Sequence, residues 1–259
     1  MKRILIIALN VFLLTGMIFL LGFAEYSHEQ LSCKDVKLTL HIDGADTLLT
    51  YEEVAGAIEK VNGKLKGREV SGISIEKVNS SVLAIPYVET CESHLTVNNV
   101  LYIDVRQRTP LFKVITTGNK WFVVDVKGYI MPYPDKHILN LPVAGGMAGD
   151  EFMLFQGTGV SGFLLGKTSA MPSLYRIMTE LNRDDLLKQL IDAVFVTETS
   201  EFEFFPKVGS QKIILGDTNH LRMKLENLKS FYKEVVPKTG LDYYNSVDLR
   251  FINQVVCNK

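Results

Sequence analysis

The chain has 259 residues, 47% of them hydrophobic, with 28 basic and 29 acidic side chains. This length suits one large folded domain or two small ones, and a content of 22% charged and 10% aromatic residues is not typical of a disordered chain. A nucleic-acid-binding protein would carry a basic excess or a basic stripe, but the formal net charge is −1 and the sequence shows no basic stripe. These features exclude nucleic acid as a partner.

An uncharged apolar run occupies residues 4–23 at the N-terminus. As a helix rising about 1.5 Å per residue, it would span roughly 30 Å, the thickness of the hydrocarbon core of a bilayer. Lys2 and Arg3 precede the run, and Glu25 follows it. The positive-inside rule therefore predicts a short cytoplasmic tail at 1–3, one membrane helix, and an extracytoplasmic location for the rest of the chain.

A cleaved signal peptide is the alternative interpretation of the same run, because Gly22-Phe23-Ala24 is a small-x-small pattern. The apolar core of a signal peptide is about 7–15 residues long, which is shorter than this run. We therefore expect an uncleaved anchor in the inner membrane. Within it, Thr15 and Gly16 are the small residues that would permit close contact with another membrane helix.

The three cysteines, Cys33, Cys91 and Cys257, are widely spaced and form no C-x-x-C pair, so they indicate neither a zinc site nor a redox motif. In an oxidising compartment Cys33 and Cys91 could form a disulfide. We favour the simpler interpretation that all three are small, partly buried hydrophobic residues.

After a connector at 24–35, residues 36–109 predict one compact β-α-α-β-β module. Its first helix has the sequence of a capping box, with Thr50 as N-cap and Glu53 three residues later. In its last strand, apolar residues alternate with polar ones, as in a half-buried strand. The predicted elements are a strand at 36–42, helices at 51–61 and 74–84, and strands at 88–97 and 100–108.

Residues 110–259 predict a larger, β-rich domain, so that the fold class of the whole chain is α+β behind one membrane helix. Proline and the Gly145-Gly146 pair favour a loop-rich stretch at 132–146. Periodicity predicts the other elements. These are strands at 112–116, 121–126, 129–131, 193–197, 202–206, 211–215 and 246–256, and helices at 173–181, 184–190 and 219–236.

Two glycine-rich patterns resemble nucleotide-binding motifs. Residues 157–162 match G-x-G-x-x-G, but Pro172 interrupts the helix that such a motif should open. Gly166-Lys167-Thr168 resembles the end of a phosphate-binding loop, but the required glycine five positions earlier falls on Ser161. We interpret both stretches as ordinary loops and expect no cofactor.

A second pair of patterns resembles a penicillin-binding enzyme. Ser230 begins an S-x-x-K match and Lys238 begins a K-T-G match. In such enzymes the two motifs converge across a cleft from distant parts of the chain, but here they are almost adjacent. The five histidines are scattered without metal-ligand spacing. We therefore expect no enzyme activity, no catalytic residue, no metal site and no small-molecule substrate.

Three segments together resemble the FtsQ/DivIB family of bacterial cell-division proteins. Residues 100–110 are similar to the family's "I-x-V-x-E-R-x-P" strand, with Gln107 in place of Glu. Residues 121–128 are similar to its "lvD-x-x-G" hairpin, and residues 247–256 to its "V-D-L-R-Y-x-N-Q-V-V" strand, with Phe251 for Tyr. The sharp matches cover about 30 residues, but they occur in the family's order.

The resemblance implies a POTRA module at 36–109, a family-type β-domain at 110–259, and a role as division-site scaffold. Its expected partners are small single-span coiled-coil proteins of the FtsB and FtsL type and other members of the division complex, through which it would help control septal peptidoglycan synthesis. A terminal strand at a sheet edge can accept a partner strand. The candidate partner-binding residues are Val247, Asp248, Leu249, Arg250, Phe251, Gln254, Val255 and Val256.

Alternative interpretations remain for these residues and for the protein. Val247, Leu249 and Phe251 have the period-2 spacing of core residues, and Arg250 could pair with an acidic residue of a partner. At the level of function, the alternative is a POTRA-containing component of outer-membrane protein assembly or secretion. Proteins of that class usually carry tandem modules or a transmembrane barrel, and the sequence indicates one module and no run of barrel strands.

Overall fold

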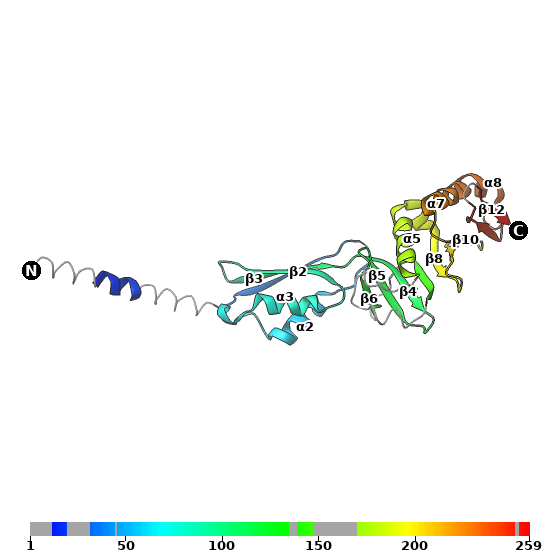
Figure 1. Ribbon diagram of the computed structural model, residues 1–259. Coiled ribbons are helices and arrows are strands. Elements are labelled where there is room, and N and C mark those ends of the chain that lie inside the picture. The colour runs from blue at the N-terminus through cyan, green and yellow to red at the C-terminus, as the bar shows by residue number, and fades with distance from the viewer. Residues whose placement is uncertain (1–11, 20–31, 45, 135–138, 148–169, 252–253) are drawn as a thin grey trace, which may run out of the picture. The chain divides into compact units, whose positions relative to one another are not determined.

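A computed structural model describes residues 12–19, 32–44, 46–134, 139–147, 170–251 and 254–259 (Figure 1). The chain divides into two compact units. The first comprises Met1–Ile42 and Leu49–Gln107, and the second comprises Asp43–Leu48 and Arg108–Lys259. Both combine strands and helices, so the predicted α+β class is confirmed for the described residues.

The first unit contains a three-stranded sheet with the strand order β1-β3-β2. Strand β1 (Asp35–His41) runs parallel to β3 (Val100–Gln107), and β3 is antiparallel to β2 (Val88–Leu95). Helices α2 (Tyr51–Asn62) and α3 (Ile75–Leu83) lie on the same side of this sheet in Figure 1, and a short turn of 3₁₀ helix, η1 (Val70–Gly72), connects them. The chain order is therefore the predicted β-α-α-β-β.

Local signals in the sequence set the ends of these elements. The Glu53 N–H donates to Thr50 Oγ1 at 3.2 Å, and the Thr50 N–H donates to Glu53 Oε2 at 3.1 Å, which confirms the capping box. Gly63, with φ +70°, ends α2. In β3 the alternate residues Leu101, Ile103 and Val105 are all fully buried, as the alternation predicts.

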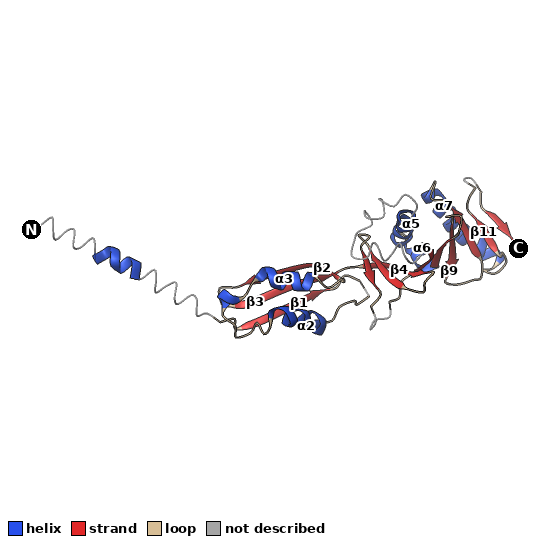
Figure 2. Ribbon diagram, turned by 60° about the horizontal axis from the view of Figure 1, so that its bottom comes forward, coloured by secondary structure: helices blue, strands red, loops and turns tan. Residues whose placement is uncertain are grey.

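The second unit contains a nine-stranded sheet with the order β12-β11-β10-β9-β8-β7-β4-β5-β6. One hydrophobic core packs buried residues of the sheet against those of the helices. The strands are β4 (Pro110–Thr116), β5 (Trp121–Asp125), β6 (Ile130–Pro132), β7 (Val143–Met147), β8 (Ile191–Val196), β9 (Phe202–Pro206), β10 (Lys212–Gly216), β11 (Ser246–Asp248) and β12 (Val256–Asn258). The helices are α5 (Met171–Arg183), α6 (Asp185–Leu190), α7 (Leu221–Ser230), η3 (Phe231–Val235) and α8 (Val236–Thr239), which Figure 2 shows in blue.

The prediction of loop at 132–146 is wrong at its end, because β7 lies there and pairs in parallel with both β4 and β8. The two glycines that suggested a loop are needed inside the sheet. A Cβ on Gly146, where φ is +84°, would lie 2.0 Å from the Val196 carbonyl oxygen. A Cβ on Gly145 would lie 2.6 Å from the ring of Phe195. Glycine here permits close approach of a neighbouring strand rather than a turn.

The helix predicted at 219–236 is present but is not a single regular helix. It begins at Leu221 as α7, continues through η3 with the wider turn of a π-helix, and ends in α8. Pro237 has no N–H to donate to the carbonyl four residues earlier, which weakens the regular α pattern at this point. Ser230 and Lys238, which begin the S-x-x-K and K-T-G matches, therefore lie along one continuous helical segment.

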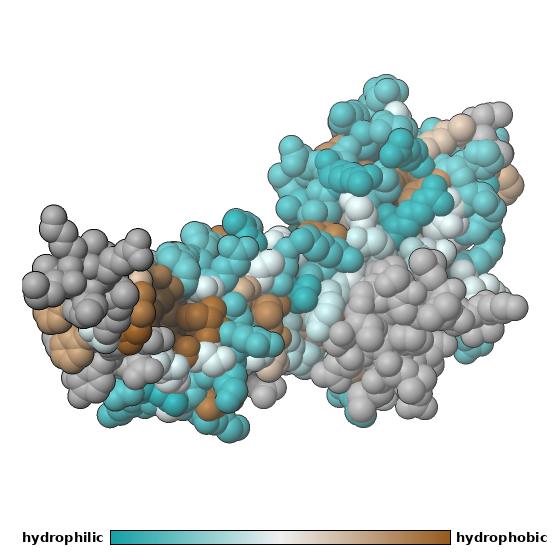
Figure 3. Space-filling view, turned by 60° about the vertical axis from the view of Figure 1, so that its left-hand side comes forward, coloured by the Kyte–Doolittle hydropathy of each residue, from teal (hydrophilic) through white to brown (hydrophobic). Residues whose placement is uncertain are grey.

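Residues 12–19 are helical and their apolar side chains are exposed, Phe12 by 76% and Phe19 by 74%. Figure 3 shows exposed hydrophobic surface in brown. Over the described residues, no helix has both the length and the apolar character that crossing a membrane requires. Most of the predicted membrane helix at 4–23 and both glycine-rich motifs, 157–162 and 166–168, lie outside the described residues.

Cys33 and Cys91 are buried and Cys257 is half-buried, and all three are free thiols. This agrees with their interpretation as small hydrophobic residues. Burial raises the pKa of the Cys91 thiol.

Candidate partner-binding edge

The C-terminal segment forms the last two strands of the nine-stranded sheet. Strand β11 runs parallel to β10, with Val247 opposite Ile213, and β12 runs antiparallel to β11, with Cys257 opposite Val247. Among the described strands β12 pairs only with β11, so its outer side is a free edge. A strand in this position offers alternate backbone N–H and C=O groups to a further strand.

The prediction of one continuous strand at 246–256 is wrong. Residues 246–248 and 256–258 are two separate strands, which pair antiparallel as the terminal hairpin. Asp248 causes the chain to turn, because its Oδ1 accepts the N–H of Arg250 at 3.0 Å. Such a bond between an aspartate and the backbone two residues later replaces strand pairing by a local turn.

The candidate residues before this turn are anchored in the protein core. Val247 and Leu249 are fully buried, and the Leu249 N–H donates to the Ile214 carbonyl oxygen at 2.8 Å. Their interpretation as core residues is therefore confirmed. Phe251 does not belong to this core, since it is 46% exposed.

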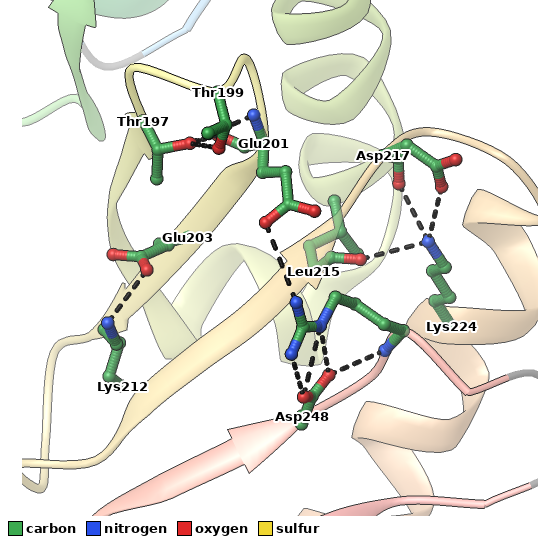
Figure 4. Close-up of polar contacts among 10 residues, drawn as sticks. Thr197, Thr199, Glu201, Glu203, Lys212, Leu215, Asp217, Lys224 and Asp248 are labelled. Atoms are coloured by element: carbon green, nitrogen blue, oxygen red, sulfur yellow. Dashed lines mark hydrogen bonds and ion pairs between the residues drawn. The ribbon is translucent and has the colours of Figure 1, made fainter.

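Asp248 and Arg250 form a bidentate ion pair beside the edge. Arg250 Nη2 lies 2.7 Å from Asp248 Oδ2 and its Nε lies 3.0 Å from Oδ1, while Nη1 lies 3.8 Å from Glu201 Oε2 (Figure 4). Burial by itself would raise the pKa of Asp248, but the hydrogen bonds and charge of Arg250 outweigh it and hold this pKa below its ordinary value. The guanidinium of Arg250, which could pair with an acidic residue of a partner, thus already lies beside two carboxylates of its own chain.

Lys224 fixes the turn between β10 and α7, and sequence reasoning did not identify it. The residue is 3% exposed, and its Nζ donates to the carbonyl oxygens of Leu215 and Asp217 at 3.0 and 2.9 Å and to Asp217 Oδ1 at 2.8 Å (Figure 4). The hydrogen bond from Lys224 lowers the pKa of Asp217. The sequence did hold a signal, because Lys224 stands on the helical stripe that Leu221, Leu225 and Leu228 otherwise make apolar.

A groove of about 450 Å³ lies between the helical segment and β12. Val255 and Cys257 line it from the terminal segment, and both pack partly against the core of the unit. Glu234 is an exposed acidic residue of the same groove. The remaining lining residues are Asn227, Ser230, Phe231, Val235, Tyr244 and Gln254.

Aromatic residues stand where the chain enters β11. Tyr243 and Tyr244 pack edge to face with ring centroids 4.9 Å apart. Lys259 Nζ lies 2.6 Å from the hydroxyl of Tyr243 and 4.2 Å from its ring centroid, and this hydrogen bond raises the pKa of Lys259. Tyr243, Phe251 and Gln254 are exposed, and Val255 and Val256 are half-buried.

The structure therefore divides the eight candidate residues into two groups. Val247, Asp248 and Leu249 are buried and hold the edge in place, whereas Arg250, Phe251, Gln254, Val255 and Val256 are at least partly accessible. The two candidates for membrane-helix contact lie in the helix at 12–19, where Thr15 Oγ1 donates to the Phe12 carbonyl oxygen at 3.0 Å and Gly16 is exposed.

The second unit thus combines a large mixed sheet with a short free edge at β12 and a groove beside that edge, and the first is a small separate α+β unit. The sequence model of the family described as FtsQ/DivIB, C-terminal related, matches residues 109–258. The chain belongs to the FtsQ/DivIB family, so the resemblance found in the sequence is confirmed. No curated protein matches this sequence.

Family membership indicates a role in cell division, at the membrane of the division site, through interactions with other division proteins. Proteins of this family are generally not enzymes.

Proposed function

We propose that this protein is a non-enzymatic scaffold of the division complex, which joins small single-span coiled-coil proteins of the FtsB and FtsL type and helps control septal peptidoglycan synthesis. In this proposal residues 4–23 form a single membrane helix with a cytoplasmic tail at 1–3, and residues 36–109 are a POTRA module beyond the inner membrane. The β-α-α-β-β order and the strand order β1-β3-β2 of the first unit support the POTRA assignment.

The observation that carries the proposal is the free edge of β12 beside a groove. A partner strand adding to β12 would gain backbone hydrogen bonds from the edge, and alternate side chains of that strand would meet the groove. Val255 and Cys257 already direct apolar surface into this groove. The partner residue that enters it is therefore expected to be apolar, with a polar or basic neighbour near Glu234.

In-cell photocrosslinking tests this proposal at the edge. Probes placed singly at Phe251, Gln254 and Val256 are expected to capture a small single-span coiled-coil protein. Two matched controls follow from the structure. Val247 is fully buried, and Met223 is 42% exposed on α7 and is not among the residues that line the groove beside β12.

Capture from the three edge positions but from neither control would support strand addition at β12. Equal capture from Met223, or none from the edge, would contradict it. An outer-membrane barrel protein captured instead would favour the alternative role in outer-membrane assembly.

A further inference from the structure

The second sheet edge of interest is β1, in the first unit. It pairs with β3 in unbroken parallel register over seven residues, from Asp35 opposite Val100 to His41 opposite Arg106. The bridge between Ser32 and Glu69 and the ion pair between Lys66 and Asp35 place residues 66–69 beside its N-terminal end. From Val36 to His41 no other described strand pairs with it, so this part of its outer side is a free strand edge. In Figure 2 it lies next to α2.

The opposite edge of the same sheet, β2, is built differently. Its pairing with β3 is irregular between Val88 and Thr90, and Glu89 and Glu92 place negative charge along it. Bulges and charged residues are the devices by which sheet edges avoid pairing with other chains. Strand β1 has no irregularity, and its central charge, Lys37, is drawn over the sheet, with Nζ 3.3 Å from the hydroxyl of Tyr102.

The apolar face of β1 is incompletely covered. Val36, Leu38 and Leu40 are only half-buried, although their neighbours on β3 are fully buried. A groove of about 330 Å³ lies between β1 and α2, and an added Cβ on Gly56 of α2 would meet nothing within 4 Å. The groove is lined by Val36, Leu38, Ala55, Ile58, Glu59, Gly63, Lys64, Leu65 and Lys66.

The residues of β1 are complementary to themselves when two copies are placed antiparallel about Leu38. Val36 then faces Leu40 of the other copy, and Leu38 faces Leu38, so apolar residues meet on the groove side. On the other side Lys37 faces Thr39, and at the ends Asp35 faces His41. No pair brings like charges together, which is the cross-strand arrangement that stabilises antiparallel pairing.

We propose that β1 is a self-association edge, which pairs antiparallel with β1 of a second copy of this chain. The two three-stranded sheets become one six-stranded sheet, and the half-buried apolar residues of each β1 extend the core of the other copy below its α2 helix. This inference goes beyond the proposed function, because it concerns the first unit and does not depend on what binds β12.

Register-specific disulfide formation in the full-length protein in native membranes tests this proposal. Two differently tagged copies, one with Lys37→Cys and the other with Thr39→Cys, are coexpressed and oxidised with copper phenanthroline. Cross-strand Cβ atoms in directly opposed positions are about 4.5–5.5 Å apart, close enough for a disulfide after a small adjustment. The mixed pair is expected to crosslink at least five-fold more than either variant paired with itself, and wild-type copies give the background from the native thiols.

Filling the groove supplies the second measurement. Ala55 is exposed in α2 and lines the groove, so Ala55→Phe is expected to reduce the mixed crosslink to background without unfolding the chain. Val61→Phe is the matched control, because Val61 is 62% exposed on the same helix and lies outside the groove. The smaller variant Ala55→Leu is expected to give an intermediate loss.

Equal crosslinking of all cysteine combinations, or none, would overturn the proposal, because it would show collision or no contact rather than a defined register. A mixed crosslink that persists in a folded Ala55→Phe protein would also overturn it. Capture of a division partner at β12 is measured separately, so failure here leaves the proposed function standing.

Discussion

The sheet edges at β1 and β12 are supported in different ways. Strand β1 is seven residues long and is held along its whole length by β3, so its conformation depends on one regular strand pair. Strand β12 is three residues long and is held by β11, which is equally short. Its position therefore depends on groups outside the strand, namely the buried Val247 and Leu249, the Asp248 turn and the Lys224 contacts. A short edge strand needs such contacts from outside the strand, whereas a long edge strand is held by its own backbone pairing.

The largest effect is expected from breaking the core anchor of the terminal hairpin. Leu249→Asp would place a charge at a fully buried position, and we expect it to lower the free energy of unfolding by more than about 3 kcal/mol and to abolish photocrosslinking from Gln254. Phe251→Asp changes a 46% exposed position two residues later and is expected to lower the free energy of unfolding by about 0.5 kcal/mol. Urea unfolding measures both, and equal losses would show that the hairpin is not anchored through Leu249.

A smaller effect is expected from Lys224→Met. The variant leaves the carbonyl oxygens of Leu215 and Asp217 without their donor, at a cost of about 1–2 kcal/mol. Hydrogen exchange is expected to rise in β11 and to stay unchanged in β1. The control is Lys233→Met, at an exposed position on the same helical segment. Exchange that rises equally in both variants would contradict a supporting role for Lys224.

The smallest effect is expected from removing the charge of Asp248, and it should distinguish the two edges by how the stability of each unit depends on pH. The pKa of Asp248 is held below its ordinary value of 3.8, so the ionised form favours the folded state. Its contribution is fully present above the unfolded-state pKa and is lost as pH falls through the lower, folded-state pKa. We expect Asp248→Asn to lower the free energy of unfolding by about 1 kcal/mol at neutral pH. The stability of the second unit should then depend less on pH below about pH 4.

The matching variant in the first unit is Asp35→Asn. Asp35 also has a lowered pKa, because Lys66 donates to it at 2.9 Å, but this pair is exposed and screened by solvent. The unfolding temperature, measured between pH 3 and pH 7, is expected to differ less from that of the wild-type protein for Asp35→Asn than for Asp248→Asn. The reverse order would mean that the ion pair at β12 does not support its edge.

Local patterns in the sequence predicted most of the first unit and most of the elements of the second. Thr50 and Glu53 gave the start of α2, and the alternation in β3 gave its buried face. Pattern reasoning failed where a tertiary contact or a single hydrogen bond decides the structure. Gly145-Gly146 resembles a turn, yet it lies in a central strand because only glycine admits the neighbouring residues.

The candidate site shows the same division. Alternation through Val247, Leu249 and Phe251 favours one strand, and the period of two residues carries no information about the turn that Asp248 makes with Arg250. The sequence therefore located the candidate segment but not the residues that form its edge. Lys224 was detectable as a charge on an apolar stripe, but its acceptors lie in the preceding turn and could not be identified without the fold.

The π-helical turn η3 also bears on how chains of this kind can change in length. A π-helical turn holds one residue more than an α-helical turn and commonly marks an inserted residue within a helix. Removing one residue from Phe231–Val235 would restore regular α geometry but would rotate everything after it by about 100°. Tyr244 and the start of β11 follow about ten residues after η3, so a deletion here would misdirect the strand that carries the edge. We expect natural relatives that lack this residue to carry a compensating change in length between α8 and β11.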